Sequence, residues 1–119
     1  MEANTKIIEL QVYSIIVNEK AVSTEDGNKV FEQIDRAFEQ DNKVSVDFSG
    51  IVILISTFLN AAIGQLYSKY KSNYLNKNLS IKGLSNEDII LLRKVIDRAK
   101  EYFKDKNAFE GTVKESIDE

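Results

Sequence analysis

The chain of 119 residues contains no cysteine and no histidine. The lack of cysteine excludes a thiolate nucleophile, and the lack of histidine excludes an imidazole base and the nucleophilic triads built on one. Together the two absences remove almost every kind of zinc site. We therefore predict no metal site, no cofactor and no catalytic centre of these kinds. The absence of cysteine is also compatible with a reducing compartment.

The chain also has no large excess of either charge and no long apolar run. The net charge is −3, and Lys and Arg are interleaved with acidic residues, whereas nucleic-acid-binding proteins usually carry a basic stripe. The longest apolar run, Ile51–Ile55, is far shorter than the roughly 20 residues of a membrane span. The first residues, MEANTK, lack the basic start and apolar core of a signal peptide. We expect a cytoplasmic protein that binds neither nucleic acid nor membrane.

Apolar periodicity predicts strands that alternate with helices. Alternation with period two predicts a strand over Lys6–Val17 and a central strand over Lys43–Phe48, and residues 79–81 form a third candidate. The apolar stretch after Gly50 either extends the central strand or bends into the next element. This order predicts an α/β fold, a single domain with a mixed β-sheet of about four strands and three main helices packed on it.

The helices carry recognisable start signals. Ser23 followed by Asp26, and Ser85 later in the chain, resemble capping boxes. Between these two helices, apolar spacing predicts a heavily buried helix over Thr57–Ser72. Gly27 falls in the first turns of its helix, where it either allows close backbone packing or is simply tolerated. We assign residues 1–106 to the domain and residues 107–119 to a polar, acidic tail that is expected to be flexible.

Asp47 ends an apolar strand, where α/β folds usually place functional groups. One interpretation is a phosphoryl acceptor like that of response-regulator receivers, but the acidic pair and the Lys that such a site needs are not evident. The other interpretation is that Asp47 caps the tight turn before Ser49 and Gly50.

Ser56 and Thr57 form a pair of hydroxyls before the buried helix. Both residue types are favoured N-caps, so one interpretation is that they only start the helix. The other is that a partner phosphorylates one of them, since a phosphate at a helix start meets free N–H groups.

Ser56, Asn60, Gly64 and Ser68 are spaced by four and form a stripe of small or polar groups. We expect the buried helix to show this stripe to solvent. It is either a docking strip for a partner or the solvated side of an amphipathic helix.

The stretch VDFSGIVILISTFLNAAIGQLY resembles the bacterial STAS-like domains of unknown function, the DUF4325 group. The matching motifs are Asp47-Phe-Ser-Gly50, Ser56-Thr-Phe58 and Gly64-Gln-Leu-Tyr67. The upstream VSTEDGNKVFEQI is similar to the helix start of the group, with Glu25 where Arg is common. The likeness covers roughly residues 22–83 and implies a STAS-like fold and a regulatory role.

In the wider STAS family, anti-sigma factor antagonists carry an Asp-Ser-Ser-Gly turn whose second Ser is phosphorylated by a kinase of the GHKL ATPase fold. Matching the segments places Ile55 at the Asp, Ser56 and Thr57 at the two Ser positions, and Phe58 at the Gly. The resemblance therefore implies Thr57 or Ser56 as a phosphorylation site, without the acid and the glycine. It also implies a partner similar to a GHKL-type ATPase.

These observations lead to a non-catalytic regulatory module, active in signalling, that binds a protein partner. The alternatives are a receiver-like or other enzyme domain using Asp47, and a subunit of a defence or mobile-element assembly; a homodimer is left open. The residues predicted to contact the partner are Asp47, Ser49, Gly50, Ser56, Thr57, Asn60, Gly64 and Ser68.

Overall fold

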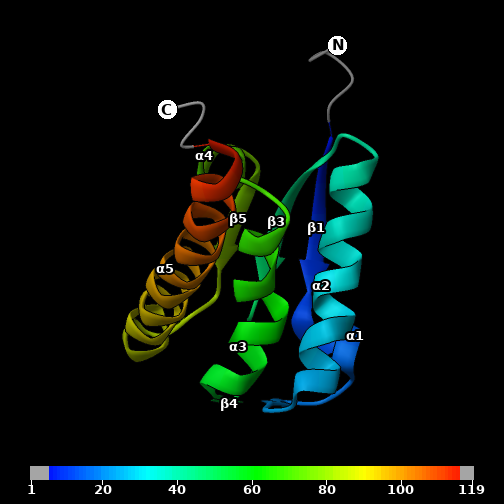
Figure 1. Cartoon of the computed structure of the whole chain (residues 1–119). Helices are drawn as coiled ribbons and strands as arrows, with labels where there is room; N and C mark the ends of the chain where they lie inside the picture. The colour runs from blue at the N-terminus through cyan, green and yellow to red at the C-terminus, as the bar shows by residue number, and fades with distance from the viewer. Residues whose placement is uncertain (1–5, 116–119) are drawn as a thin grey trace.

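The computed structural model of the chain describes the backbone of residues 6–115 and the side chains of residues 6–104 (Figure 1). It confirms an α/β domain, in which the strands form two small parallel sheets, ordered β1-β3-β5 and β2-β4, instead of one mixed sheet. The elements are β1 (Ile7–Gln11), α1 (Val12–Ile16), β2 (Lys20–Ala21), α2 (Thr24–Glu39), β3 (Lys43–Asp47), β4 (Ile53–Leu54), α3 (Ser56–Ala62), the 3-10 helix η2 (Gly64–Ser68), α4 (Ser72–Asn78), β5 (Leu79–Lys82) and α5 (Asn86–Glu115).

The three-stranded sheet packs one face on the helices and leaves most of the other face exposed, apart from the buried Ser45 of the central strand. Leu10, Val46 and Ile81 lie side by side in the register and face the helices. On the other face Glu9 of β1 and Lys82 of β5 are exposed and form an ion pair with 2.8 Å between Oε2 and Nζ. The core therefore lies on one side of this sheet, between the strands and helices α2, α3 and α5 (Figure 1).

The first strand is shorter than its apolar alternation predicts. The predicted strand over Lys6–Val17 ends at Gln11, and the chain turns into the short helix α1. Val12 and Ile16, four residues apart, are both buried by this turn. Val17 closes the helix with a left-handed φ of 53° and donates its N–H to the Tyr13 carbonyl at 2.8 Å. The period-two pattern was wrong here because Val12 and Ile16 also fit a single helical turn.

Helix α2 begins where its capping box predicts, and it packs closely on α3. The Ser23 hydroxyl accepts the Asp26 N–H at 3.0 Å. Gly27 is buried against α3, and a Cβ atom at this position would lie 2.6 Å from the Phe58 carbonyl oxygen and 2.7 Å from the Ala61 Cβ. Of the two interpretations of Gly27, the structure supports close backbone packing.

The predicted helix over Thr57–Ser72 is broken into two pieces. Helix α3 ends at Ala62, and the chain continues as the 3-10 helix η2. The Gln65 side chain donates from Nε2 to the Ala61 carbonyl at 2.7 Å, so a side-chain amide occupies an acceptor at the end of α3. The apolar spacing did not reveal this break, because both pieces keep their apolar side on the core.

The last helix starts at its predicted cap and continues beyond its expected end. The Ser85 hydroxyl accepts the Asp88 N–H at 3.1 Å, and α5 runs to Glu115. Residues 107–115, predicted to belong to the tail, are thus helical in the backbone, and residues 116–119 lie outside the described part. That the tail is flexible stays a prediction. Within the described residues no helix combines the length and the apolar character needed to cross a membrane.

We predict that Gly27→Ala lowers the free energy of unfolding. Forcing a methyl group against backbone atoms of α3 costs about 1–3 kcal/mol, which exceeds the gain of up to about 1 kcal/mol from replacing Gly in a helix. Urea denaturation followed by circular dichroism measures the change.

The matched control is Gly64→Ala, because a Cβ atom at Gly64 meets its nearest neighbour, the Val95 Cγ1, at an ordinary 3.6 Å. This variant is expected to lose clearly less stability than Gly27→Ala, because its methyl group meets its neighbours only at ordinary van der Waals distance. Equal stability of the Gly27→Ala variant and the unmodified chain would show that the two helices are free to move apart.

Candidate interaction site

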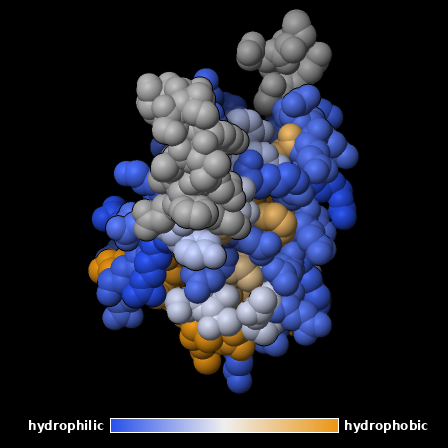
Figure 2. Space-filling model, viewed as in Figure 1, coloured by the Kyte–Doolittle hydropathy of each residue, from blue (hydrophilic) through white to orange (hydrophobic). Residues whose placement is uncertain are grey.

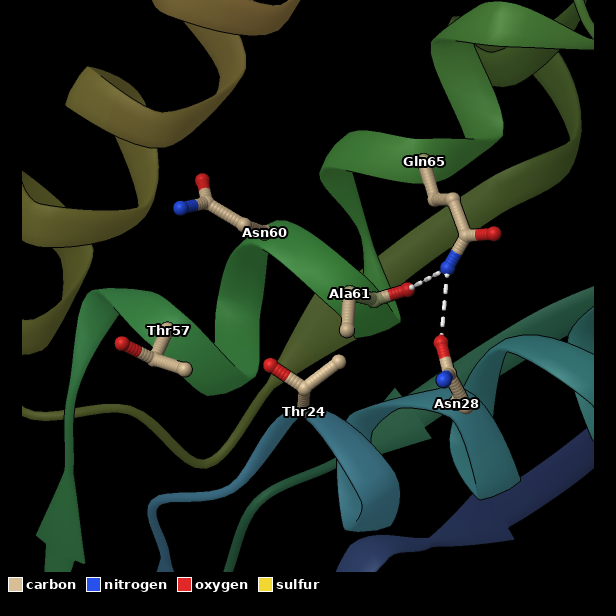
Figure 3. Close-up of a pocket in the computed structure, with 6 residues that line it drawn as sticks. All are labelled: Thr24, Asn28, Thr57, Asn60, Ala61 and Gln65. Atoms are coloured by element: carbon tan, nitrogen blue, oxygen red, sulfur yellow. Dashed lines mark hydrogen bonds between the residues drawn. The ribbon is translucent and has the colours of Figure 1, made fainter.

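A hollow lies between the start of α2, the whole length of α3 and the start of η2 (Figure 3). Its volume is about 420 Å³, and it is a shallow hollow open to solvent rather than an enclosed cavity. Because the two helices touch at Gly27, the side chains on either side of the contact form its walls. The lining residues are Thr24, Asn28, Thr57, Asn60, Ala61 and Gln65.

One wall of the hollow is held by a pair of hydrogen bonds. Gln65 donates from Nε2 to Asn28 Oδ1 at 2.9 Å and to the Ala61 carbonyl at 2.7 Å, which links η2 to α2 and α3 (Figure 3). Thr24 from α2 faces Thr57 and Ala61 across the hollow, and Asn60 stands at its rim on the opposite side from α2 (Figure 3). The hollow thus combines a fixed amide pair with exposed side chains of Thr24, Thr57 and Asn60.

The hollow carries no charge of its own. Its lining consists of hydroxyl, amide and methyl groups, and residues 48–68 contain no Asp, Glu, Lys or Arg. The arrangement can donate and accept hydrogen bonds from an uncharged polar group. It offers no nucleophile–base pair.

A charged cluster further along α2, beyond the Asp26–Lys29 ion pair, serves the fold. Lys69 places its Nζ 2.9 Å from the Asp35 carboxylate, and the Tyr70 hydroxyl donates to the same carboxylate. Burial acts to raise the pKa of Asp35, but the hydrogen bonds from Tyr70 and Lys69 outweigh it and hold the pKa below its usual value. Burial and this carboxylate raise the pKa of Tyr70. These contacts fasten the segment after η2 to α2 and keep Asp35 ionised.

Ser56 and Thr57 are not the cap of α3. The N-cap is Ile55, which makes no side-chain capping bond, and the first turn closes on its backbone carbonyl. Ser56 is half-buried and Thr57 is exposed at the hollow. The interpretation that the hydroxyl pair starts the helix as a cap is therefore wrong. The extended conformation of Ile55, the residue after β4, sets the start of α3 instead.

The stripe spaced by four does not form one solvent-facing strip. Asn60 and Ser68 are exposed, but Gly64 is buried against Val95 and Ala99 of α5. The Ser68 hydroxyl donates to the Gln65 carbonyl at 2.7 Å within η2. The break after α3 turns Gly64 toward the core, so the expectation that it lies on an exposed stripe is wrong.

Asp47, Ser49 and Gly50 form a turn at the end of β3. Asp47 Oδ1 accepts the Ser49 N–H at 2.9 Å and the Ser49 hydroxyl at 2.7 Å. The hydroxyl of Ser49, then its backbone N–H, lower the pKa of Asp47. Gly83, with φ of +83°, packs on this turn, and a Cβ atom there would lie 2.6 Å from Asp47 Oδ1. The structure shows the turn-capping geometry, and none of these residues lines the hollow.

A lysine that sequence reasoning overlooked lies beside this turn. Lys82 is in register with Asp47 at the carboxyl ends of β5 and β3, and its pairing with Glu9 raises the pKa of the Lys82 ammonium. Among the described residues no group of three or more acidic side chains could hold a metal ion. A phosphoryl acceptor at Asp47 stays a prediction.

Comparison with known proteins identifies the family. The sequence profile of the STAS-like domain of unknown function (DUF4325) matches residues 26–88, more than half of the chain. The chain belongs to this STAS-like family. No curated protein and no solved structure matches it. The matched segment of the STAS-like domain spans α2 to the start of α5 and contains all of the hollow except Thr24.

Thr24, Asn28 and Gln65 line the hollow of this STAS-like domain but were not predicted. Thr24 and Asn28 belong to α2, and only the packing of α2 on α3 brings them to Thr57. Two signals in the sequence point to the region: a glycine inside a well-capped helix, which marks a close crossing, and the uncharged run over residues 48–68.

Ser23 caps a helix and Thr57 does not, so alanine substitutions at the two positions are expected to differ in their effect on stability. In the STAS-like domain Ser23→Ala removes the bond to the Asp26 N–H and is expected to lower the free energy of unfolding by about 1 kcal/mol. Thr57→Ala is expected to change it by less than about 0.5 kcal/mol. Chemical denaturation of both variants measures the difference, and equal losses would restore a capping role for Thr57.

Proposed function

We propose that this STAS-like domain is a non-catalytic regulatory module that binds a protein partner through the hollow between α2 and α3. The observation that carries the proposal is the hollow itself, which gathers Thr57 and Asn60 with Thr24, Asn28 and Gln65. Uncharged hydroxyl and amide groups suit the polar side chains and backbone of another protein. The proposed partner is a regulator such as a GHKL-type ATPase, as the family resemblance implies.

The hollow supports binding rather than turnover. Its side chains carry hydrogen-bond donors and acceptors but no titratable group, and a general acid or base needs one. The Gln65–Asn28 and Gln65–Ala61 hydrogen bonds fix one wall before a partner arrives, and such preorganisation lowers the entropy lost on binding. Of the eight residues predicted to contact a partner, we keep Thr57 and Asn60 as the central ones.

Asn60→Arg tests the hollow as a partner-binding site. Asn60 is exposed, so the variant keeps the fold, while a long charged side chain at the rim blocks the hollow. We expect the affinity for the partner recovered from the native host to fall by about tenfold or more. Affinity capture followed by a binding titration measures the loss.

The matched control is Asn73→Arg, the same change at an exposed position on α4 outside the hollow. It is expected to bind like the unmodified chain. Equal affinity of the two variants, with both folded by circular dichroism, would contradict a binding role for the hollow.

We further propose that the partner phosphorylates Thr57. The Thr57 hydroxyl is exposed and does not cap the helix, whereas Ser56 is half-buried. A phosphate adds a charge of about −1.5 to −2 to a segment that has none between residues 48 and 68. Such a charge would change the hollow from neutral to strongly anionic and switch partner binding.

Incubation of the chain with the partner and ATP, followed by intact-mass measurement, tests this proposal. We expect the mass added by one phosphoryl group on the unmodified chain and on Ser56→Ala, and no addition on Thr57→Val. Thr57→Val keeps the shape of the side chain and removes the hydroxyl. An unchanged mass of the unmodified chain would reject the phosphorylation while leaving the binding role of the hollow standing.

A further inference from the structure

An apolar patch covers the small sheet β2-β4 at the end of the molecule where α2 and α3 begin. Val22, Val52, Ile53 and Ile55 are all exposed there, Val52 to 69%. Figure 2 shows apolar surface at this end of the molecule, in orange, next to the paler surface over the starts of the helices. Leu54, between the exposed isoleucines, points into the core. The patch is thus a strand face that the described part of the chain leaves uncovered.

Strand β4 is an edge whose only protective feature is its length of two residues. Natural edge strands carry charged residues, proline or bulges that prevent pairing with another chain. Here residues 51–55 read Ile-Val-Ile-Leu-Ile, and no charged residue occurs from residue 48 to residue 68. The strand is therefore well suited to accept a further strand.

The backbone groups on one side of β4 are already hydrogen-bonded to β2 and its neighbouring residue. The N–H groups of Ile53 and Ile55 donate to the carbonyls of Glu19 and Ala21, on the β2 side. Since successive residues of a strand direct their N–H and C=O groups to opposite sides, those of Leu54 point to the other edge. Within the described residues β4 pairs with β2 alone, so this edge has no strand beside it.

We propose that a second copy of this chain pairs with β4 in antiparallel fashion, with Leu54 on the two-fold axis. Two copies of Leu54 then exchange both of their N–H···O=C bonds, the hydrogen-bonded pair of an antiparallel ladder. Ile53 of each copy lies opposite Ile55 of the other, so the apolar side chains meet across the axis. The β2-β4 sheets of the two copies then join into one four-stranded sheet, β2-β4-β4-β2. A sheet of only two strands is marginally stable in water, and three or more strands are needed for independent stability.

Charge does not oppose a second copy at this place. Each chain carries a net charge of −3, so two copies repel one another wherever their charged faces meet. The β4 edge is uncharged, and a two-fold axis brings it against an identical uncharged edge. This pairing is independent of the proposed function of the hollow, because no residue of β4 lines the hollow. Asn60 and Gln65 lie outside the paired strands.

Mass measurement in solution tests the pairing. The full chain is expected to change from monomer to dimer with rising concentration in light scattering coupled to gel filtration. Ile53→Lys places two like charges across the axis and is expected to raise the dimer dissociation constant by about tenfold or more. Ile90→Lys, the same change at a position on α5 that is 54% exposed, is expected to leave the dimer intact.

Cysteine cross-linking tests the register, since the chain has no cysteine of its own. Residues 53 and 55 of opposite copies form a non-hydrogen-bonded pair with Cα atoms about 4.5 Å apart, within the range of about 4.4–6.8 Å for disulfides. Residue 53 lies diagonally from its own copy, about 7–8 Å away. An oxidised mixture of Ile53→Cys and Ile55→Cys chains is therefore expected to form cross-linked dimers, and each variant alone to form few.

Three outcomes of these experiments would overturn the proposal. A chain that stays monomeric at every concentration overturns the proposal and leaves β4 to an extended segment of another protein. A dimer that Ile53→Lys leaves intact, or one that Ile90→Lys disrupts equally, also overturns it. If Ile53→Lys fails to fold, the cross-linking decides: cross-links in the single-variant samples as strong as those in the mixture reject the register.

Discussion

The contact between the backbones of α2 and α3 at Gly27 determines where the other features of this face lie. Ala61, which touches Gly27, also forms part of the hollow, and Thr24 and Asn28 stand on either side of that contact. The strands that directly precede the two helices also lie side by side, as the parallel β2-β4 pair. The hollow and the β2-β4 pair are therefore both formed by the segments that meet at this crossing.

Charge divides the molecule into a neutral region and a charged one. Residues 48–68 supply the neutral region, which includes β4, α3 and η2. The ion pairs lie outside these residues, between Glu9 and Lys82 on the sheet, between Lys69 and the acids of α2, and between Asp26 and Lys29 at the start of α2. A neutral surface associates without desolvation of charges, a penalty that offsets much of the attraction of buried ion pairs. The neutral region is therefore where association costs least.

Local signals in the sequence predicted the local parts of the fold. The caps at Ser23 and Ser85 were correct because a capping box depends on residues three apart. The buried position of Gly64 and the break after α3 were not predicted, since they depend on α5 and on the Gln65 amide. Of the six residues that line the hollow, only Thr57 and Asn60 were predicted site residues, whereas Thr24 and Asn28 enter through the packing of α2.

Thr57 connects the hollow with the strand edge. It lines the hollow, and it follows Ile55, the last exposed apolar residue of the β4 segment, by two residues. A negative charge on Thr57 would lie in the hollow itself, and only Ser56 separates Thr57 from Ile55 along the chain. Salt screens exposed charges beyond about 8 Å, so the effect of this charge is strongest in the hollow. A modification of Thr57 would therefore act first on partner binding, whereas Ile53 affects only the edge.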